Sequence, residues 1–528
     1  MKYKLRDYQE DLISQTRSAY NNSPETPKIV VTAPTRSGKT IIFASMAKKI
    51  QDNNKKVWIL THRQEIFDQT FEKLVDFGIS PGQIRSDKNL SKNNVQVAMI
   101  QTLYNVLKKQ ERIKKDYKFN KFEIVEKPDL IIIDECHHSK SKTWQDTLTY
   151  YDDVPLIGFT ATPERLDGKG LCDIFDALVI GNDTQWMIDN YWLSKPIHLC
   201  PPSPLDKVNL KKIMGDYDKK SQAEIMKKHI VCANVVKSYR EFFNGAPVIV
   251  FCVTIDHCEQ MEKAYREDGW NPVVLSSKMK KKERRDAVSG LREGKYNQLI
   301  SCEVVSEGFD VPAVYGVQLL RKTASLALYL QMSARGLTPI YSEKYPNIED
   351  INVRKKAIKE GKPESIILDH AGNYWLHGSI TKKRDWSIDH KTRKIKKNTI
   401  EKLTCPKCFY SWEFNVKKCP HCGHSFEKEK AEAKLFEMHE LKDRLIDIAD
   451  LKNNEADNLS KVIMRIKDYD NKNKAMIAIM HNSIRHQELN LQNKLKGMCE
   501  GLGYDRKYHY RVWQHLKKTY GDKLDRLA

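Results

Sequence analysis

The chain has 528 residues, 40% of them hydrophobic, which is enough for roughly two to four domains with cores of their own. Its 90 lysines and arginines outnumber its 69 aspartates and glutamates, and the formal net charge of +21 points to a polyanionic partner, either a nucleic acid or an acidic membrane surface. The sequence has no run of about eighteen apolar residues, and residues 1–6 lack a signal-peptide apolar stretch, which argues against membrane insertion and secretion and favours a soluble protein of the cytoplasm.

Five short apolar runs in the first third of the chain predict buried β-strands. Helical-looking stretches at residues 41–51 and 64–77 separate several of them. Strands that alternate with helices are typical of a mostly parallel sheet buried on both faces. The predicted strands lie at residues 30–31, 57–60, 95–100, 130–133 and 156–159.

A second series of apolar runs begins after Gly245, at residues 248–252, 273–275, 298–301, 317–320 and 366–369. It predicts a second α/β domain, so the expected fold class is α/β with two tandem domains and parallel sheets. The polar stretch 341–362 is expected to be a surface excursion. The predicted parts are a first domain at 1–200, a helical connector at 201–240 and a second domain at 241–378.

Residues 33–40, with the sequence Ala-Pro-Thr-Arg-Ser-Gly-Lys-Thr, predict a phosphate-binding loop between the first strand and a helix. Backbone N–H groups of such a loop point at the phosphates, and the helix adds the positive end of its dipole. Gly38 lets the backbone pass close to the phosphates, Lys39 places a charge between the β- and γ-phosphates, and the Thr40 hydroxyl would ligate Mg²⁺. Ala33 and Arg36 depart from the generic pattern of the loop.

Two carboxylates and a histidine follow the buried run 130–133. Asp134 would hold the same Mg²⁺ through water, and Glu135 is placed to orient and deprotonate an attacking water. A chance loop and a solvated acidic pair are the alternative for each motif taken alone. Both motifs follow Val/Ile-rich strands, and together they predict a protein that binds and hydrolyses a nucleotide.

Four of the twelve cysteines are grouped in two Cys-x-x-Cys turns. Each turn aims two thiolates at one point, and four soft ligands without an open position suit a structural, tetrahedral Zn²⁺. A dithiol redox pair is the alternative. We expect a zinc ribbon at 403–426, ligated by Cys405, Cys408, Cys419 and Cys422.

The segments around the ribbon are basic or helical in character. A basic linker is expected at 379–402, where Trp386 and the cations at 382–384 would suit a fork or a single strand. Trp412 is better explained as the core residue of the small ribbon. The stretch 427–528 predicts a helical C-terminal domain, which is either a packed cap or a surface for DNA or a partner.

From residue 5 to about residue 378 the chain resembles the superfamily 2 helicases of the DEAD/DEAH-box kind found in bacteriophages and prophages. The segment Leu-Arg-Asp-Tyr-Gln at 5–9 is similar to the family's adenine-reading segment, and Thr-Ala-Thr-Pro at 160–163 to its coupling motif. Residues 305–312 and 329–339 resemble the fifth and sixth motifs, and 367–373 a segment common in the phage group.

The resemblance implies two RecA-like lobes that close on ATP and carry the nucleic acid. It implies catalytic roles for Lys39, Asp134, Glu135, His137, Gln331 and Arg335. The expected nucleotide contacts are Arg6, Gln9, Thr35, Arg36, Ser37, Gly38, Lys39, Thr40, Gly308, Asp310 and Arg335. The expected nucleic-acid contacts are His62, Arg63, Gln101, Thr102, Thr254 and Ser306, although helix capping or solvation is an alternative for His62 and Arg63.

The sixth motif departs from the family at two positions, because Ala334 stands where a Gly is usual and Thr338 where the usual arginine finger stands. Loss of such a finger costs roughly 10³- to 10⁵-fold in related phosphoryl transfers. One hypothesis is that Arg335 carries the transition-state charge with lower turnover, helped by Arg321 or by a residue from the nucleic acid or a partner. The competing hypothesis is an ATP-gated DNA clamp or scaffold with weak hydrolysis.

The resemblance therefore implies an ATP-dependent DNA helicase or translocase in phage replication, recombination or branch remodelling. A translocase that remodels protein–DNA complexes without unwinding is the runner-up. The implied cofactors are ATP, Mg²⁺ and Zn²⁺. The implied partners are forked, branched or single-stranded DNA and, through the C-terminal region, replication or recombination proteins; a phage-encoded chain would act in the host cytoplasm.

Overall fold

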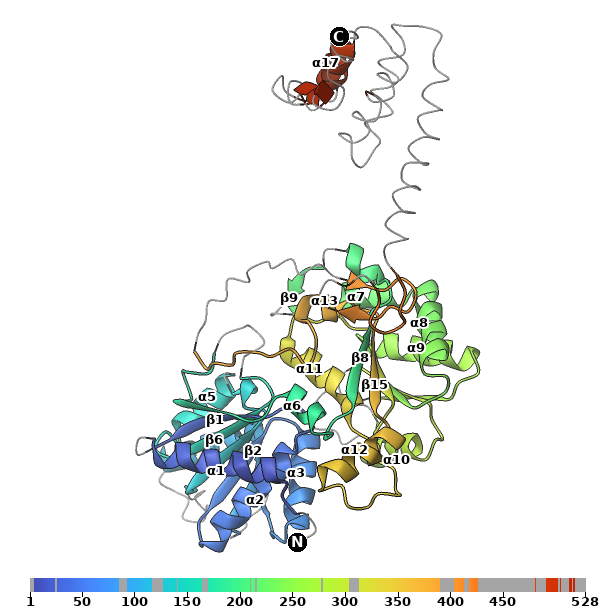
Figure 1. The fold of residues 1–528 in the computed structure, drawn as a ribbon. Coiled ribbons are helices and arrows are strands. Elements are labelled where there is room, and N and C mark those ends of the chain that lie inside the picture. Colours follow the sequence, from blue (N-terminus) through green and yellow to red (C-terminus); the bar gives the residue numbers. More distant parts are fainter. Residues whose placement is uncertain are drawn as a thin grey trace. The chain divides into compact units, whose positions relative to one another are not determined.

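The computed structural model covers the whole chain (Figure 1). It describes residues 4–23, 26–84, 93–115, 127–139, 141–163, 170–208, 210–213, 216–276, 279–302, 313–389, 403–412, 416, 418–425, 480, 491–501, 504, 512–514 and 516–517. Two compact units make up the chain, residues 1–415 and 416–528. The first unit contains two α/β lobes, each built on its own parallel sheet.

The first lobe holds a seven-stranded sheet in the order β3-β4-β2-β5-β6-β1-β7, in which every pairing is parallel. Alternate residues of its strands face two separate cores. Ile29 and Val31 of β1 lie in one core, and Val30 lies in the other, so both faces are buried as the apolar runs predict. The strands are β1(Lys28–Thr32), β2(Val57–Thr61), β3(Gly82–Ile84), β4(Val95–Met99), β5(Leu130–Asp134), β6(Leu156–Thr160) and β7(Ala177–Ile180). The helices are α1(Asp7–Asn21), α2(Lys39–Asp52), α3(Gln64–Asp76), α4(Ile100–Lys115), the 3-10 turn η1(Cys136–His138) and α5(Lys142–Thr149). The next helix, α6(Thr184–Asp189), follows β7, but its Met187 packs into a core of the second lobe.

The second lobe holds a six-stranded parallel sheet in the order β12-β13-β11-β14-β15-β8. Its strands also face two cores, with Ile249 in one and Val250 in the other. The strands are β8(Lys195–Leu199), β11(Val248–Phe251), β12(Pro272–Leu275), β13(Gln298–Ser301), β14(Gly316–Leu319) and β15(Glu364–Asp369). The helices are α7(Lys219–Met226), α8(His229–Phe242), α9(Ile255–Glu267), α10(Lys281–Arg292), α11(Leu326–Ala334), η3(Arg335–Leu337), α12(Ile351–Glu360) and α13(Asn373–His377).

The fold class predicted from the sequence is confirmed, and ten predicted strands coincide with β1, β2, β4, β5, β6, β11, β12, β13, β14 and β15. The structure adds short edge strands that have no long apolar run. One of them, β8, falls within the predicted first domain at 1–200, yet it pairs with β15 in the second sheet. The reason is that Ile197 and Leu199 pack into the second lobe's core, a contact that local sequence does not encode.

The connector predicted at 201–240 contains more than helices. The short turn η2(Pro204–Lys207) is followed by an antiparallel hairpin of β9(Lys212–Ile213) and β10(Asp216–Tyr217), and only then by α7 and α8. After α13 the chain returns to the first lobe, because the backbone N–H of Cys172 donates to the carbonyl of Ile388 at 2.9 Å. Cys172 itself is exposed, unlike the buried Cys136 and Cys252.

The stretch 341–362 is more than a surface excursion. It carries α12, whose Arg354 is only 4% exposed, and it ends at Lys362, which is only 1% exposed. Arg354 is buried because its guanidinium stacks 3.6 Å from the ring centroid of Trp192 and its Nε donates to the carbonyl of Asn190 at 2.7 Å. Because the stretch is rich in charged residues, its sequence did not indicate that Arg354 and Lys362 would be buried.

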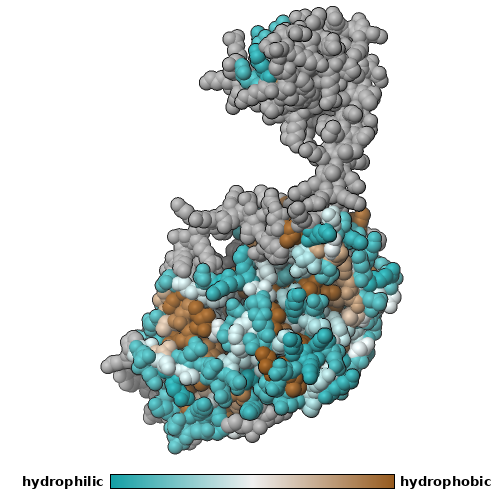
Figure 2. Space-filling model, viewed as in Figure 1, coloured by the Kyte–Doolittle hydropathy of each residue, from teal (hydrophilic) through white to brown (hydrophobic). Residues whose placement is uncertain are grey.

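The face of the first unit in Figure 2 carries mostly hydrophilic residues, with apolar residues in separate groups. Among the described residues, the C-terminal part of the first unit holds the short strands β16(Leu403–Thr404) and β17(Ser411–Trp412), and the second unit holds α17(Leu491–Gly501). Most of the predicted linker at 390–402 and of the predicted helical domain at 427–528 lies outside the described residues. Within the described part, no helix has the length and apolarity needed to cross a membrane.

Candidate nucleotide-binding site

A pocket of about 330 Å³ lies where the strand ends of the first lobe meet the second lobe. The phosphate-binding loop follows β1, and Asp134 ends β5, so both come from the C-terminal edge of one parallel sheet. The second lobe contributes Arg335 to the lining of this pocket. The lining includes the predicted site residues Thr35, Arg36, Gly38, Lys39, Thr40, Asp134, Glu135 and Arg335.

The backbone of the loop is shaped for an anion. Arg36 and Gly38 both have left-handed conformations, with φ of 74° and 84°, and α2 begins immediately afterwards at Lys39. Alternating backbone conformations of this kind turn successive N–H groups toward one point. The Ser37 hydroxyl is buried and has no hydrogen-bond partner within the described part of the chain. These features fit a bound phosphate group.

Lys39 and Glu135 contact each other across the pocket, with 3.3 Å between the lysine Nζ and the carboxylate Oε1. Glu135 has a left-handed backbone with φ of 53°, and its N–H donates to the Asp134 carboxylate at 3.0 Å. This turn directs both carboxylates toward the pocket. Thr40 and Asp134 offer the hydroxyl and carboxylate oxygens that Mg²⁺ prefers.

A polar chain leads from Glu135 to the motif after β6. The His137 Nδ1 lies 3.3 Å from the Glu135 carboxylate and 3.0 Å from the Thr160 hydroxyl. The Thr160 hydroxyl in turn donates to the carbonyl of Thr162 at 2.8 Å. The predicted coupling residues are therefore in direct contact with one another.

The predicted adenine-reading segment contacts the back of the phosphate loop. The Gln9 side-chain amide and the Tyr8 hydroxyl both donate to the carbonyl of Ser37, at 3.0 and 2.9 Å. The Arg6 guanidinium lies 3.9 Å from the ring centroid of Trp192, which Arg354 approaches from α12. Sequence reasoning missed Trp192 and Arg354, because neither belongs to a motif.

The structure describes some, but not all, of the predicted site residues in the second lobe. Gln331 lies on α11 and is buried, and Arg335 follows on η3. The Thr338 hydroxyl, at the position of the usual finger, is buried without a hydrogen-bond partner in the described part of the chain. Ser306, Gly308 and Asp310 lie outside the described residues.

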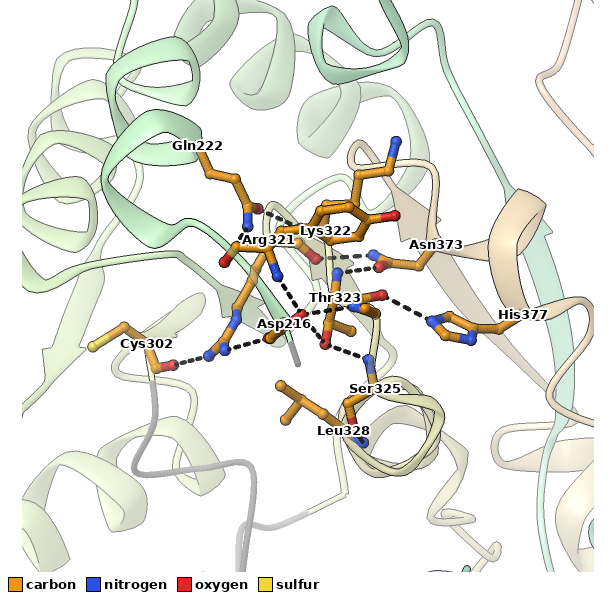
Figure 3. Close-up of polar contacts among 12 residues, drawn as sticks. Asp216, Gln222, Cys302, Arg321, Lys322, Thr323, Ser325, Leu328, Asn373 and His377 are labelled. Atoms are coloured by element: carbon orange, nitrogen blue, oxygen red, sulfur yellow. Dashed lines mark hydrogen bonds and ion pairs between the residues drawn. The ribbon is translucent and has the colours of Figure 1, made fainter. Parts of the chain in front are cut away.

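Arg321, the suggested helper of Arg335, has a different environment (Figure 3). Its guanidinium lies 3.1 Å from the carboxylate of Asp216 on β10. Asp216 also accepts hydrogen bonds from the Thr323 hydroxyl at 3.0 Å and the Ala324 N–H at 2.6 Å. Asn373 accepts from the Thr323 N–H at 2.9 Å. Arg321 therefore belongs to a polar cluster that holds the loop before α11, and it is not among the residues lining the nucleotide pocket.

The predicted nucleic-acid contacts lie at the carboxyl ends of strands. His62 and Arg63 follow β2, Gln101 and Thr102 open α4 after β4, and Thr254 follows β11. Arg63 occupies the N-cap position of α3 without a side-chain capping bond, whereas the Thr254 hydroxyl accepts from the His257 N–H at 3.3 Å. The Thr254 side chain thus caps α9, and the structure shows no such capping bond from Arg63 to α3.

The four ribbon cysteines form one cluster. Their sulfur atoms all lie within 4.8 Å of one another. A tetrahedral zinc site with bonds of about 2.3 Å needs sulfurs roughly 3.8 Å apart, so the cluster fits that ion. Trp412 is 3% exposed, as expected of a core residue.

Two parallel sheets in tandem, with a phosphate loop on the first and an arginine delivered by the second, define a nucleotide-binding protein with paired RecA-like lobes. Residues 2–165 match the family model "Type III restriction enzyme, res subunit", and residues 226–337 match "Helicase conserved C-terminal domain". A protein of a Lactococcus phage, the "51.5 kDa protein", is 30% identical over 410 residues, which cover 77% of this chain and 80% of the phage protein. The chain belongs to superfamily 2 of the ATP-dependent helicases.

Two further similarities agree with this family. IRC3 of Saccharomyces cerevisiae, provisionally named an ATP-dependent helicase, is 27% identical over 366 residues, covering 66% of this chain and 51% of IRC3. The chain thus spans about half the length of that relative. The fragment structure of a provisionally assigned HsdR subunit of a type I restriction enzyme from Vibrio vulnificus has a TM-score of 0.50 at 19% identity, covering 70% of this chain and 66% of that one. This second similarity supports the fold alone.

Proposed function

We propose that the chain is an ATP-dependent DNA helicase or translocase that couples ATP hydrolysis to movement on, or unwinding of, DNA. The observation that carries the proposal is the pocket in which the phosphate loop, Asp134 and Glu135 of one lobe face Arg335 of the other. A site divided between two lobes converts a change at the phosphates into relative movement of the lobes.

Each residue has a chemical task in this proposal. Lys39 leaves Glu135 and binds the β- and γ-phosphates, which frees the Glu135 carboxylate to accept a proton from the attacking water. Arg335 stabilises the charge on the transferred phosphoryl group, and Gln331 lies on the same helical segment. Thr40 and Asp134 would hold Mg²⁺, which supplies charge neutralisation at the phosphates.

The chain His137–Thr160–Thr162 would communicate the nucleotide state to the strand-binding loops. We infer that the nucleic-acid contacts are to backbone phosphates, because a motor that steps along any sequence cannot depend on base edges. The residues proposed for these contacts are His62, Arg63, Gln101, Thr102, Thr254 and Ser306. Asp310 would bond the ribose, and Gly308 would let the backbone approach the nucleotide.

The choice of DNA, and of phage replication, recombination or branch remodelling, is supported by the similarity to a phage protein and by the net charge of +21. A phage-encoded chain would act in the host cytoplasm, and the C-terminal region would recruit replication or recombination proteins.

Zn²⁺ would hold the ribbon together as a structural ion, because four cysteines leave no open position for chemistry. Metal analysis of the purified chain should give about one zinc per chain, and Cys405→Ser or Cys419→Ser should remove it. Cys172→Ser, at an exposed single cysteine, is the matched control. An unchanged zinc content in the ribbon variants would exclude the site.

Thr338 favours one alternative, an ATP-gated DNA clamp or scaffold with weak hydrolysis, because the usual second arginine is missing. A translocase that displaces bound proteins without unwinding is the other alternative. ATPase and strand-displacement assays on forked, flush and four-way DNA, with matched RNA, separate the three. We expect DNA-stimulated ATPase with unwinding of forks; ATPase equal to that of Glu135→Gln would favour the clamp, and ATPase without unwinding would favour the remodelling translocase.

A further inference from the structure

Lys362 is a buried cation that belongs to none of the motifs. It lies between α12 and β15, and its side chain is among the largest that the structure fully buries. Burying an ammonium group is costly unless it is paired or hydrogen-bonded. Burial first, and the positive charge of Arg36 second, lower the pKa of Lys362 to about 7.

The Lys362 ammonium joins two separate backbone segments of the second lobe. Its Nζ donates to the carbonyl of Gly336 at 2.5 Å and to the carbonyl of Val314 at 2.6 Å. Gly336 follows Arg335 directly, and Val314 lies two residues after the segment that resembles the fifth motif. One side chain thus joins the backbone beside Arg335 to the backbone at Val314.

The turn that holds Arg335 is constrained from other directions as well. The Ser365 hydroxyl also donates to the carbonyl of Gly336, at 2.8 Å, and the Ser194 N–H donates to the carbonyl of Leu337 at 2.9 Å. A Cβ on Gly336 would lie 2.9 Å from the Ser365 oxygen, so the turn packs closely against the sheet. The position of η3, and with it the position of the Arg335 guanidinium, depends on these ties.

We propose that Lys362 is a positioning residue for Arg335, acting through the carbonyl of Gly336. The inference rests on the proposed ATP hydrolysis. Because Thr338 replaces the usual finger, a single arginine would carry the transition-state charge, and its placement becomes critical. Lys362 supplies part of that placement from behind the turn and does not itself line the pocket.

The test uses Lys362→Met in the full chain, which keeps the length of the side chain and removes its donors and charge. We expect kcat for ATP to fall by about tenfold while KM stays within about twofold, because the lost interaction acts in the transition state. The affinity for ADP–aluminium fluoride should fall by about tenfold, whereas the affinity for ADP should not change. Lys359→Met, at an exposed position of α12, should leave all four quantities unchanged.

Two outcomes would overturn the positioning role of Lys362. One is a folded Lys362→Met variant with wild-type kcat, and the other is a folded variant whose affinities for ADP–aluminium fluoride and for ADP keep the wild-type ratio.

If Lys362→Met does not fold, Ser365→Ala provides the test, because it removes the hydroxyl that also donates to the Gly336 carbonyl. This variant should lower kcat by about threefold at unchanged KM, and an unchanged kcat would overturn the proposal. A wild-type chain without Glu135-dependent ATPase would instead overturn the proposed function, and the role of Lys362 with it.

Discussion

The two lobes provide their site residues in different ways. In the first lobe, Lys39, Asp134 and Glu135 lie at or just beyond strand ends, and local backbone conformation aims them at the pocket. In the second lobe, Arg335 sits on a short turn whose position depends on side chains distant in sequence, such as Lys362. The first half of the site is encoded locally and the second by tertiary packing, so the two halves should respond differently to substitution.

The largest effect is expected at the locally encoded half. Lys39→Ala should abolish ATP retention and lower ATPase by roughly 10²- to 10³-fold or more, because the lysine of a phosphate loop places its charge between the β- and γ-phosphates. Equilibrium binding of a fluorescent ATP analogue measures the loss. Lys48→Ala, at a lysine of the same helix that pairs with Asp52, should bind normally. Identical nucleotide retention by wild type and Lys39→Ala would contradict the assignment of the site.

The second-lobe arginine comes next. Arg335→Ala should reduce kcat by roughly 10³-fold with little change in the affinity for ATP. Arg266→Ala, on an exposed part of α9, serves as the control in the same steady-state assay. If Arg335 works alone and with lowered turnover, Thr338→Arg should raise kcat. Failure of that variant to raise kcat would mean that another cation already fills the role.

A moderate effect on stability is expected at the cluster of Figure 3. Asp216→Asn leaves the Arg321 guanidinium, 8% exposed, without its carboxylate, and should lower the free energy of unfolding by about 2 kcal/mol. Urea denaturation provides the measurement. Asp256→Asn, in a pair whose carboxylate is 78% exposed, should change stability by less than about 0.5 kcal/mol. Equal effects of the two variants would show that the cluster is not a stability determinant.

The smallest effect of a single substitution is expected in the pH dependence of stability. Burial lowers the pKa of His198 and His370 to about 3 and of His257 and His377 to about 4, from 6.5. Below pH 6.5 the unfolded chain binds protons that the folded lobe excludes, so each histidine should cost about 1 kcal/mol of stability per pH unit as the pH falls toward 4. Burial raises the pKa of Asp369 to about 6, which acts in the opposite direction between pH 6 and 3.8.

The histidine effect can be measured by comparing denaturation midpoints at pH 7.5 and 5.5. His370→Gln should reduce the loss of stability between these two pH values by the contribution of one histidine, about 1 kcal/mol per pH unit below pH 6.5. A variant with the wild-type slope would mean that His370 is protonated in the folded state.

The sequence alone predicted ten of the strands, together with the phosphate loop and the two acidic residues that line the first-lobe side of the pocket. It did not predict that α3 also lines this pocket, through residues such as Gln69 and Lys73. Strand-forming runs and the loop around Gly38 are short-range signals, and they coincide with β1, β5 and the turn into α2. By contrast, the sequence did not predict the places of β8, Arg354 and Lys362. The partners of β8 and Arg354 lie more than a hundred residues away in the chain. Lys362 is buried although its side chain carries a charge, and a charged residue is normally expected at the surface. Arg321 illustrates the same limit, since the carboxylate that holds it lies in a two-residue strand.

The contact between Lys39 and Glu135 places opposite charges 3.3 Å apart in one pocket. Neutralising either residue therefore changes the electrostatic environment of the other. Lys39→Ala and Glu135→Gln are for that reason coupled variants, and a double-mutant cycle is needed to separate phosphate binding from the activation of water.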